Sequence, residues 1–319
     1  MLKIAVSFVS VEQARGFLEH EIPAWDIAGL EAHARNRWNE MLSVLHALGI
    51  PADEGRKLYT ALFHSLVQPR DRMGDAPGWP ENAPFWDDHF TLWDTWQTLF
   101  PLLAIVHPET VAANVNSFGE RFQRNGRAET AFIQGKDFQA GQGGDGVDFV
   151  IADAFAKRIP GIDWKKVWPL LQFNAARRTE DYLKLGFVSA DGSIGGYDGR
   201  MKSGSSTLAF AYGDWCAAQV GLGLGHAAEA QPLLKRSGNW RNVWDASESG
   251  EGFSGFVRAR NRDGTFRITD PTSADGFYQR WLLSERPLLW ICCAGIRAGY
   301  GAMVVWMVVQ EMSAVSLAG

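Results

Sequence analysis

From residue 25 to residue 244, apolar residues recur along most of the chain at intervals of three and four positions. This spacing places apolar side chains on one stripe of an α-helix. Short loops that contain Gly or Pro separate most of the helical stretches. Since each apolar stripe must be covered by another element, a succession of amphipathic helices with short connections packs helix on helix. The sequence therefore predicts an all-α architecture.

The first of these helices is expected in WDIAGLEAHARNRWNEMLSVLHALG, with Asp26 as its N-cap and Gly49 just past its end. Its apolar residues form one broad stripe that includes Ile27, Leu30 and Trp38. A second helix runs from Pro51 to Pro69, and a loop rich in Asp, Gly and Pro follows it. Further helices are predicted over residues 92–105, 108–124, 147–158, 163–185, 205–223 and 227–244.

Two short β elements interrupt this helical pattern. LKIAVSFVSV, at the start of the chain, has β-branched residues and partial alternation, which predict a strand. A single strand cannot fold alone, so we expect its sheet partners to lie upstream of Met1. FVRARNRDGTFR carries Asp263-Gly264 between alternating segments, a tight-turn signal that predicts a small β-hairpin.

Composition excludes several classes of partner. The net charge is −5 and no long basic run occurs, so nucleic acid and anionic membranes are not expected as partners.

Two of the three cysteines are adjacent, which does not suit a disulfide framework, and no spaced Cys/His cluster predicts zinc. The apolar stretch 287–309 contains Arg297 and several glycines, so we expect no membrane span there. The start of the chain does not resemble a signal peptide.

The stretch HFTLWDTWQTLFPLL, residues 89–103, surrounds a single acid, Asp94, with aromatic residues. One interpretation is a capping box, with Asp94 as N-cap, Gln97 at N3 and Trp93 as the preceding hydrophobic residue. The other is a sugar site, in which the carboxylate accepts two hydroxyl hydrogens and an indole covers the apolar face of the ring. Both can hold if the start of the helix faces a pocket.

Other motifs carry less information. GQGGDG, residues 141–146, matches the dinucleotide fingerprint by letter, but no buried strand precedes it and no βαβ unit follows, so we interpret it as a loop that lines a cleft. A core Trp215 beside a solvent-facing Asp214 is the simplest interpretation of AFAYGDWCAAQV.

Seven segments, taken in order, resemble glycoside hydrolase family 92, the exo-acting α-mannosidases. They are YTALFHSLVQPRDRMGD, LWDTWQTLFPLL, FVIADAFAK, DYLKLGFV, AYGDWCAAQ, RSGNWRNVWD and GFVRARNRDGTF, and the resemblance covers about residues 3–278. It implies an N-terminal β-sandwich joined by helices to an (α/α)6 barrel of the six-hairpin glycosidase type. It also implies inverting, calcium-assisted hydrolysis of mannose-containing glycans, by proteins that are commonly exported.

Applied to this chain, the resemblance predicts four regions. They are a β-sandwich remnant (1–24), a linker helix (25–50), a partial (α/α)6 catalytic domain (51–278) and a tail outside the family (279–319). We expect that the tail is an out-of-frame or mis-spliced reading and that Met1 is an internal start.

The resemblance also assigns substrate-binding residues. Trp93 and Asp94 match the family's W-D-T motif, and His64 matches its Y-T-A-L-x-H segment. Gln97 departs from the pattern, because many members carry Arg at this position.

At the position of the family's proton donor, a Glu, this chain has Gln279. An amide cannot donate a proton as a carboxylic acid does. The segments that supply the calcium contacts and the general base have no counterpart here, so we expect neither a catalytic residue nor a metal ligand in this chain. The sequence therefore predicts an α-mannosidase fragment without turnover. One alternative is a sugar-binding protein without catalysis. The other is a different helical-barrel carbohydrate enzyme, such as a lyase or a glucosidase, whose carboxylates would come from Glu180, Asp181 or Asp214.

Overall fold

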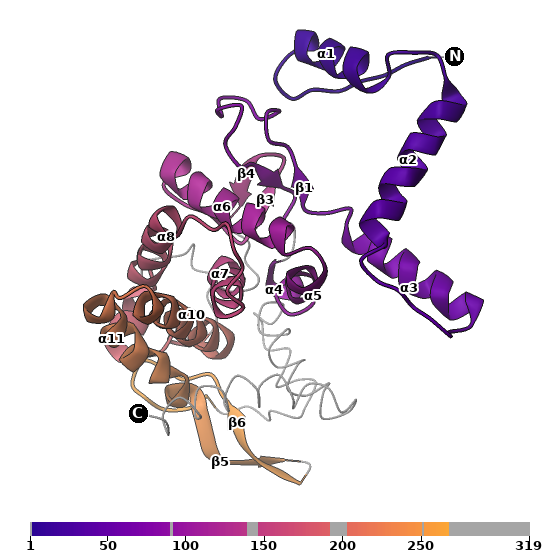
Figure 1. Ribbon diagram of the computed structural model, residues 1–319. Helices are drawn as coiled ribbons and strands as arrows, with labels where there is room; N and C mark the ends of the chain where they lie inside the picture. The colour runs from indigo at the N-terminus through magenta and orange to yellow at the C-terminus, as the bar shows by residue number, and fades with distance from the viewer. Residues whose placement is uncertain (1, 90–91, 139–145, 192–202, 251, 268–319) are drawn as a thin grey trace.

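The computed structural model describes residues 2–89, 92–138, 146–191, 203–250 and 252–267. Helices dominate it, as predicted. In chain order they are α1 (Val11–Glu21), α2 (Ile27–Leu42), α3 (Ala52–Ser65), α4 (Leu92–Thr95), α5 (Leu99–Val106), α6 (Pro108–Asn125), α7 (Gly146–Ala156), α8 (Trp164–Ala176), α9 (Glu180–Leu185), α10 (Ser203–Gly223) and α11 (Ala227–Arg236), followed by the 3-10 helix η1 (Ser237–Val243). Helices α4 to α11 form a packed body, and α1 and α2 stand apart from it as an arm (Figure 1).

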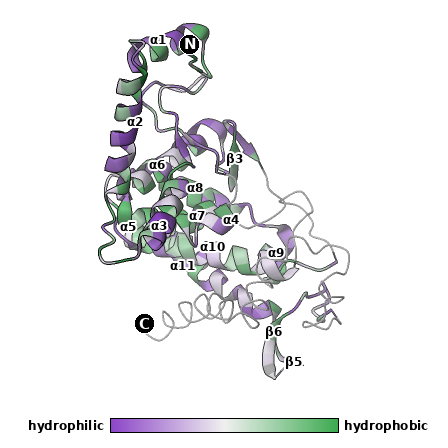
Figure 2. Cartoon of the chain, turned by 90° about the vertical axis from the view of Figure 1, so that its right-hand side faces the viewer, coloured by the Kyte–Doolittle hydropathy of each residue, from purple (hydrophilic) through white to green (hydrophobic). Residues whose placement is uncertain are grey.

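Helices α7 and α10 lie inside the body. Most residues of both helices are buried, and they contact each other. A helix buried around most of its circumference needs neighbours on every side, and here α6, α8 and α11 supply them. One continuous core joins these helices and includes Phe118, Ile151, Leu171 and Val220. Figure 2 shows the hydrophobic residues concentrated in this body, whereas α2 has a largely hydrophilic surface.

The predicted helices over 108–124, 147–158 and 205–223 are confirmed within one or two residues as α6, α7 and α10. Three other predicted helices are interrupted. The 92–105 pattern divides into α4 and α5, because a continuous helix would need Pro101 to donate a backbone hydrogen bond to Gln97, and proline has no N–H. The 163–185 pattern divides into α8 and α9 where Thr179 is extended, and 227–244 changes from α-helix to 3-10 helix at Ser237.

Within the described residues, three two-stranded antiparallel sheets lie around the body. They pair β1 (Arg70–Asp71) with β2 (Trp86–Asp87), β3 (Ala131–Ile133) with β4 (Lys136–Phe138), and β5 (Trp244–Gly250) with β6 (Phe253–Val257). None of these three pairs was predicted. At the predicted Asp263-Gly264 turn, Gly264 has a φ of 90° and a single antiparallel bridge joins Arg260 to Phe266. The hairpin signal there was therefore correct in place but produces only one bridge.

The N-terminal region differs most from expectation. No strand forms over the described residues 2–10, because they find no strand to pair with, and α1 follows them where no helix was predicted. Asp26 caps α2 as predicted, accepting a hydrogen bond from the Gly29 N–H at 2.9 Å, but the helix ends at Leu42 rather than near Gly49. The apolar stripe of α2 is not buried.

A few polar contacts hold the start of the chain to the body. The carboxylate of Asp75 accepts hydrogen bonds from the Ser7 hydroxyl at 2.6 Å and from the Phe8 N–H at 3.0 Å. The guanidinium of Arg72 lies 3.4 Å from the centre of the Phe8 ring. In the part of the chain that the structure describes, no helix combines the length and apolarity that crossing a membrane requires.

Candidate functional site

Trp93 and Asp94 lie on α4, a helix of one turn. Leu92, beside them, is 1% exposed and belongs to the core, whereas Trp93 is half-buried and Asp94 is exposed. An indole and a carboxylate on one turn, both reachable from solvent, suit a ligand that has an apolar face and hydroxyl groups. The pair is therefore available to a ligand rather than sealed in the core.

The Asp94 carboxylate has no hydrogen-bond partner within the described residues, where only its backbone carbonyl accepts. Although the side chain as a whole is exposed, its carboxyl is partly desolvated, and this raises the pKa of Asp94 above its usual range. An acceptor that has lost part of its water and gained no protein partner can bind hydroxyl groups of a ligand.

The capping-box interpretation of Asp94 is wrong. Asp94 lies inside α4, and the next helix, α5, begins after Thr98 with no side-chain capping hydrogen bond. Gln97 is half-buried and reaches Asp94 only through its backbone N–H, which lies 3.4 Å from the Asp94 carbonyl oxygen. A capping box at Asp94 requires a helix that begins just after this residue. No such helix forms, because Pro101 breaks the helical pattern at this point.

A set of aromatic rings fixes α4 against the inner helices. The indole of Trp96 lies 5.0 Å from the ring of Phe149 on α7 and 5.5 Å from that of Tyr212 on α10. Tyr212 in turn stacks on Trp215, with their centroids 5.7 Å apart. Aromatic contacts at these distances add to the stabilisation from buried area. The second indole of the motif, Trp96, therefore anchors the helix on which Trp93 and Asp94 lie.

Gly146 is the second support of α4. It is the last residue of GQGGDG and the first of α7, and the rest of that motif lies outside the described residues. A Cβ atom at Gly146 would lie 2.7 Å from Cβ of Leu92 and 2.8 Å from the Thr130 hydroxyl oxygen. Only glycine allows α4 to approach α7 this closely. Gly146 therefore allows the close packing of α4 against α7.

His64 lies on the last turn of α3 and is exposed. Its ring centroid is 5.6 Å from that of Phe63, its neighbour in sequence. Among the described residues, no hydrogen bond or ring contact joins His64 to Trp93 or Asp94. The structure therefore brings Trp93 and Asp94 together and leaves His64 on a separate helix.

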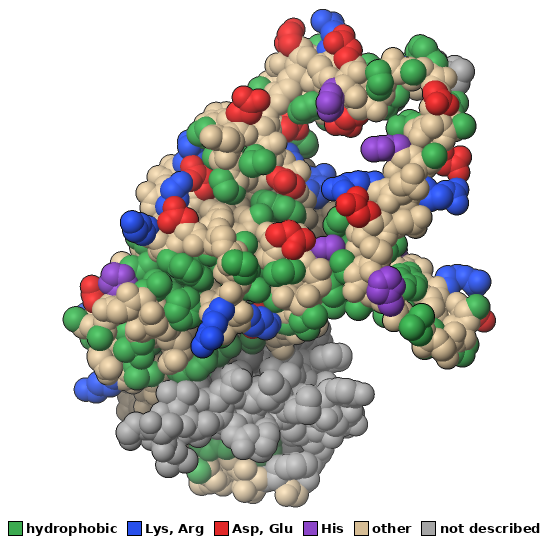
Figure 3. All heavy atoms as spheres, viewed as in Figure 1, with side chains coloured by type: hydrophobic (Ala, Val, Ile, Leu, Met, Phe, Trp, Pro, Cys, Tyr) green, Lys and Arg blue, Asp and Glu red, His purple; other side chains and the backbone are tan. Residues whose placement is uncertain are grey.

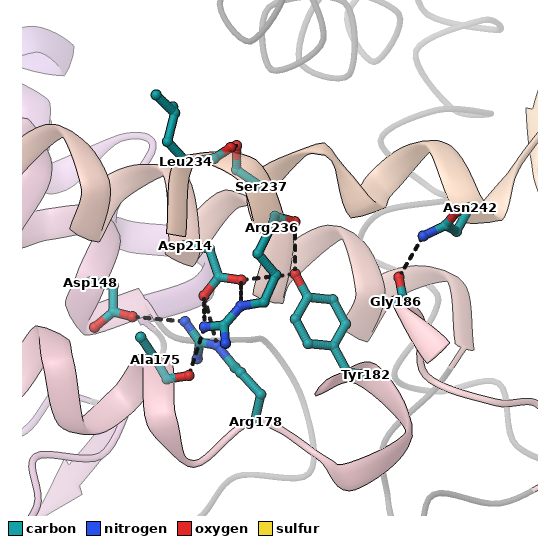
Figure 4. A network of polar contacts seen from close by, with 10 residues as sticks. All are labelled: Asp148, Ala175, Arg178, Tyr182, Gly186, Asp214, Leu234, Arg236, Ser237 and Asn242. Carbon is teal, nitrogen blue, oxygen red and sulfur yellow. Dashed lines mark hydrogen bonds and ion pairs between the residues drawn. The ribbon is translucent and has the colours of Figure 1, made fainter. Parts of the chain in front are cut away.

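A buried polar network, which the sequence analysis did not predict, crosses the body (Figure 4). The guanidinium of Arg178 lies between two carboxylates, with 3.3 Å to Asp148 and 3.4 Å to Asp214. Asp214 also accepts hydrogen bonds from Arg236 at 2.7 Å and from the Tyr182 hydroxyl at 2.9 Å. Asp148 and Asp214 have no exposed surface. The sequence carries one signal for this network, because the apolar helices α7 and α10 each contain a carboxylate. A charge buried in an inner helix needs a partner.

Burial dominates the chemistry of this network. Desolvation raises the pKa of Asp148 to about 8, although a hydrogen bond from Asn174 at 2.7 Å and the charge of Arg177 oppose the shift. Desolvation and the neighbouring Asp214 raise the pKa of Tyr182 above its usual range. The interpretation of Asp214 as solvent-facing is wrong, because α10 is an inner helix and Arg178 and Arg236 neutralise its charge.

The three carboxylates of the alternative enzyme all have partners within the protein. Glu180 is paired with Lys184 on the surface. Asp181 accepts the backbone N–H groups of Tyr182 at 2.9 Å and Ser189 at 2.8 Å, and Asp214 belongs to the buried network. Their oxygens hold structure together, so the geometry favours Asp94 as the carboxylate that is free for a ligand.

The resemblance implies a calcium ion for the intact family. Within the described residues, no group of three or more Asp, Glu, His or Cys side chains is close enough to hold a metal ion, and calcium prefers six to eight oxygen ligands. Gln279 and the whole tail 279–319 lie outside the described residues.

Comparisons with known proteins agree with the resemblance. The family model described as the glycosyl hydrolase family 92 catalytic domain matches residues 13–315, and so extends into the 279–319 segment that we expected to lie outside the family. An uncharacterized secreted glycosidase of Arthroderma benhamiae is 27% identical over an alignment of 293 residues, and the match covers 84% of this chain and 34% of that protein.

Solved structures show the same fold. An inverting mannosidase of family GH92 from Bacteroides thetaiotaomicron superposes with a TM-score of 0.71 at 23% identity, over 84% of this chain and 37% of that one. A GH92 α-mannosidase from the same organism, in complex with mannoimidazole, gives a TM-score of 0.69 at 22% identity, over 82% and 34%.

The chain spans about a third of the length of these relatives. Their similarity and the order of the seven segments agree with the family match, which covers most of the chain. The protein belongs to glycosyl hydrolase family 92.

Proposed function

We propose that this chain carries substrate-binding residues of an α-mannoside hydrolase, and that Trp93 and Asp94 hold the terminal mannose. The observation that carries the proposal is the pair on α4, a half-buried indole beside an exposed carboxylate without a protein partner. Mannose has an apolar C–H face for the indole and hydroxyl groups for the carboxylate. His64 stays in the proposal as a more distant contact, on the strength of the resemblance alone.

The reaction proposed for the whole protein is inverting hydrolysis of α-mannosides. Such a reaction needs one carboxylic acid to protonate the leaving oxygen and a second carboxylate, roughly 6.5–9.5 Å away, to activate water. The resemblance aligns Gln279 with the acid, and its amide cannot supply that proton. We therefore propose that this chain binds mannose and does not turn it over. No step is assigned to calcium, since no cluster of three or more Asp, Glu, His or Cys side chains that could hold it lies among the described residues.

The helical body is proposed to be part of an (α/α)6 barrel. The position of α7 and α10 inside α6, α8 and α11 supports this.

A second candidate function is that of a sugar-binding protein that has no part in hydrolysis. It uses the same two residues, Trp93 and Asp94, and Gln279 at the position of the acid favours it too.

Isothermal titration calorimetry of the full chain with methyl α-mannoside tests the binding residues. We expect saturable binding that Asp94→Asn weakens about tenfold or more, because a charge-assisted hydrogen bond contributes roughly 1.5–3 kcal/mol and about 1.4 kcal/mol is tenfold in Kd. Trp93→Ala is expected to weaken binding as well. Asp53→Asn is the matched control, because Asp53 is an exposed acid on α3 that pairs with Arg56.

Equal affinities of wild type and Asp94→Asn would contradict the assignment of the acid. The same preparation, incubated with an aryl α-mannoside, should release no mannose. Release above that of a heat-inactivated sample would contradict the proposed lack of turnover and leave the binding assignment intact.

A further inference from the structure

A pocket of about 550 Å³ lies at the C-terminal end of α7. Its lining residues come from α7, from the turn that follows and from the start of α8: Phe155, Ala156, Arg158, Ile159 and Trp164. The volume is in the range that small-molecule sites occupy. Since α7 begins beside Leu92, the pocket and the Trp93–Asp94 pair are separated by the length of that helix, about 16 Å for its eleven residues.

Two aromatic rings form an apolar corner in this pocket. The rings of Phe155 and Trp164 are 5.0 Å apart and nearly perpendicular, at 87°. The corner is held in place from behind, because a Cβ atom on Gly223, the last residue of α10, would lie 2.3 Å from the Phe155 ring. Both rings are half-buried, so each keeps surface that a ligand can cover.

Arg158 stands where a helix end normally has glycine. Its N–H donates to the Phe155 carbonyl at 2.9 Å, and the Ile159 N–H donates to the Ala154 carbonyl at 3.0 Å, which together form a Schellman turn. This turn places Arg158 in the left-handed region, with φ at 56°. Such a conformation is unfavourable for a residue with a side chain. The local fold therefore gains nothing from arginine at this position.

The charge of Arg158 is not neutralised by its neighbours. Nearby Lys157 is paired with Asp153 at 2.6 Å, and the carboxylate of Asp163 accepts the Lys165 N–H at 3.2 Å. Arg158 itself is exposed, and its guanidinium makes no hydrogen bond or ion pair with any described residue. A planar cation with five donors at the mouth of an aromatic corner suits a carboxylate or phosphate group.

We propose that this pocket binds a hexose that carries an anionic group, either phosphate or carboxylate. The guanidinium of Arg158 holds the anion, and the corner of Phe155 and Trp164 covers the apolar face of the sugar ring. The site is separate from the mannose-binding pair and does not depend on it.

Calorimetry with glucose 6-phosphate and with glucuronate, at low ionic strength, tests the proposal. Glucose and inorganic phosphate serve as the neutral and sugar-free controls. We expect saturable binding of at least one anionic sugar, and at least tenfold weaker binding of both controls, because each offers only half of the recognised chemistry. The affinity should fall as salt is added. Asp94→Asn should bind the anionic sugar as the wild type does, which separates this site from the proposed mannose site.

Arg158→Gly is the decisive variant, because glycine suits the left-handed position and the protein should fold at least as well as the wild type. We expect it to lose at least tenfold in affinity for the anionic sugar, and Arg158→Lys to keep part of that affinity. Gln134→Gly, which relieves a left-handed φ of 53° elsewhere, should bind as the wild type does. Three results would each overturn the proposal. They are no binding of either anionic sugar, an affinity for inorganic phosphate equal to that for the anionic sugar, and an unchanged affinity for the anionic sugar in Arg158→Gly.

Discussion

At the scale of single residues, the carboxylates of this chain differ in what surrounds their oxygens. The carboxylate of Asp214 has no exposed surface and accepts from Arg178, Arg236 and Tyr182, whereas Asp94 is exposed and its carboxylate accepts from no described group. Buried charges persist only when they are paired, so the first arrangement serves the fold. The second leaves a carboxylate for a ligand.

Asp148 makes a prediction about pH. The unfolded carboxyl loses its proton near pH 4, but burial raises the pKa of the folded group to about 8. Between these values the folded state binds one proton more, so the free energy of unfolding falls as pH rises, by about 1.4 kcal/mol per pH unit for this group. Asp148→Asn, which stays neutral, should remove this slope in urea unfolding between pH 5 and 8.

Asp153→Asn is the control for that measurement, because Asp153 lies on the same helix and pairs with Lys157 near the surface. It should keep the wild-type slope. An Asp148→Asn profile parallel to that of the wild type would show that Asp148 is ionised in the folded protein.

The two acids were not equally predictable from the sequence. Asp94 could be found because it lies between indoles in a motif that resembles a family pattern. The burial of Asp214 could not, since its partner Arg178 is 36 residues away and only the packing of α8 to α10 brings them together. Periodicity describes one helix at a time, whereas a buried ion pair depends on two.

At the scale of elements, helix type and position were largely predictable, and helix ends were not. Long periodic stretches such as α6 and α10 formed as expected. The break between α4 and α5 depends on one proline, and α2 ends at Leu42 although the apolar pattern continues beyond it. Neither is visible in apolar spacing alone, because tertiary packing decides where a helix stops.

Gly213, on the inner helix α10, gives a prediction at this scale. A Cβ atom there would lie 2.6 Å from a guanidinium nitrogen of Arg178, which Asp148 and Asp214 hold in place. Gly213→Ala should therefore lower the free energy of unfolding by about 1–3 kcal/mol through overpacking, despite alanine's better helix propensity. Urea unfolding measures this loss.

Gly16→Ala is the matched substitution, because no atom lies within 4 Å of the Cβ that it adds to α1. It should leave stability unchanged or slightly raised. Equal stability of Gly213→Ala and wild type would mean that Arg178 can move aside and that the network is less rigid than its contacts indicate.

At the scale of the whole molecule, the arm and the body differ in how their apolar side chains are covered. Leu2, Ile4 and Val6 are 81%, 70% and 70% exposed and share one side of an extended segment. Trp25 and Ile27, also in the arm region, are 60% and 62% exposed, and Figure 3 shows hydrophobic side chains facing solvent there. Contiguous apolar surface and unpaired extended backbone both favour association between molecules.

We therefore expect the chain to self-associate through its arm. Replacing Leu2, Ile4 and Val6 by Ser, Thr and Thr should lower the average mass in light scattering and sedimentation at equal protein concentration, because it removes the apolar strip without touching the core. Ile105→Thr, an isolated exposed residue on α5, is the control and should change little. A wild-type chain that stays monomeric and melts in one cooperative step would contradict this expectation.

The contact between Gly146 and Leu92 has a consequence for ligand binding. Because no side chain fits between α4 and the first residue of α7, the contact with the interior helix fixes the position of the helix that carries Asp94. A preorganised acceptor loses little conformational entropy when a ligand arrives. Any gain in side-chain volume at residue 146 would therefore be felt as weaker recognition, even in a chain that still folds.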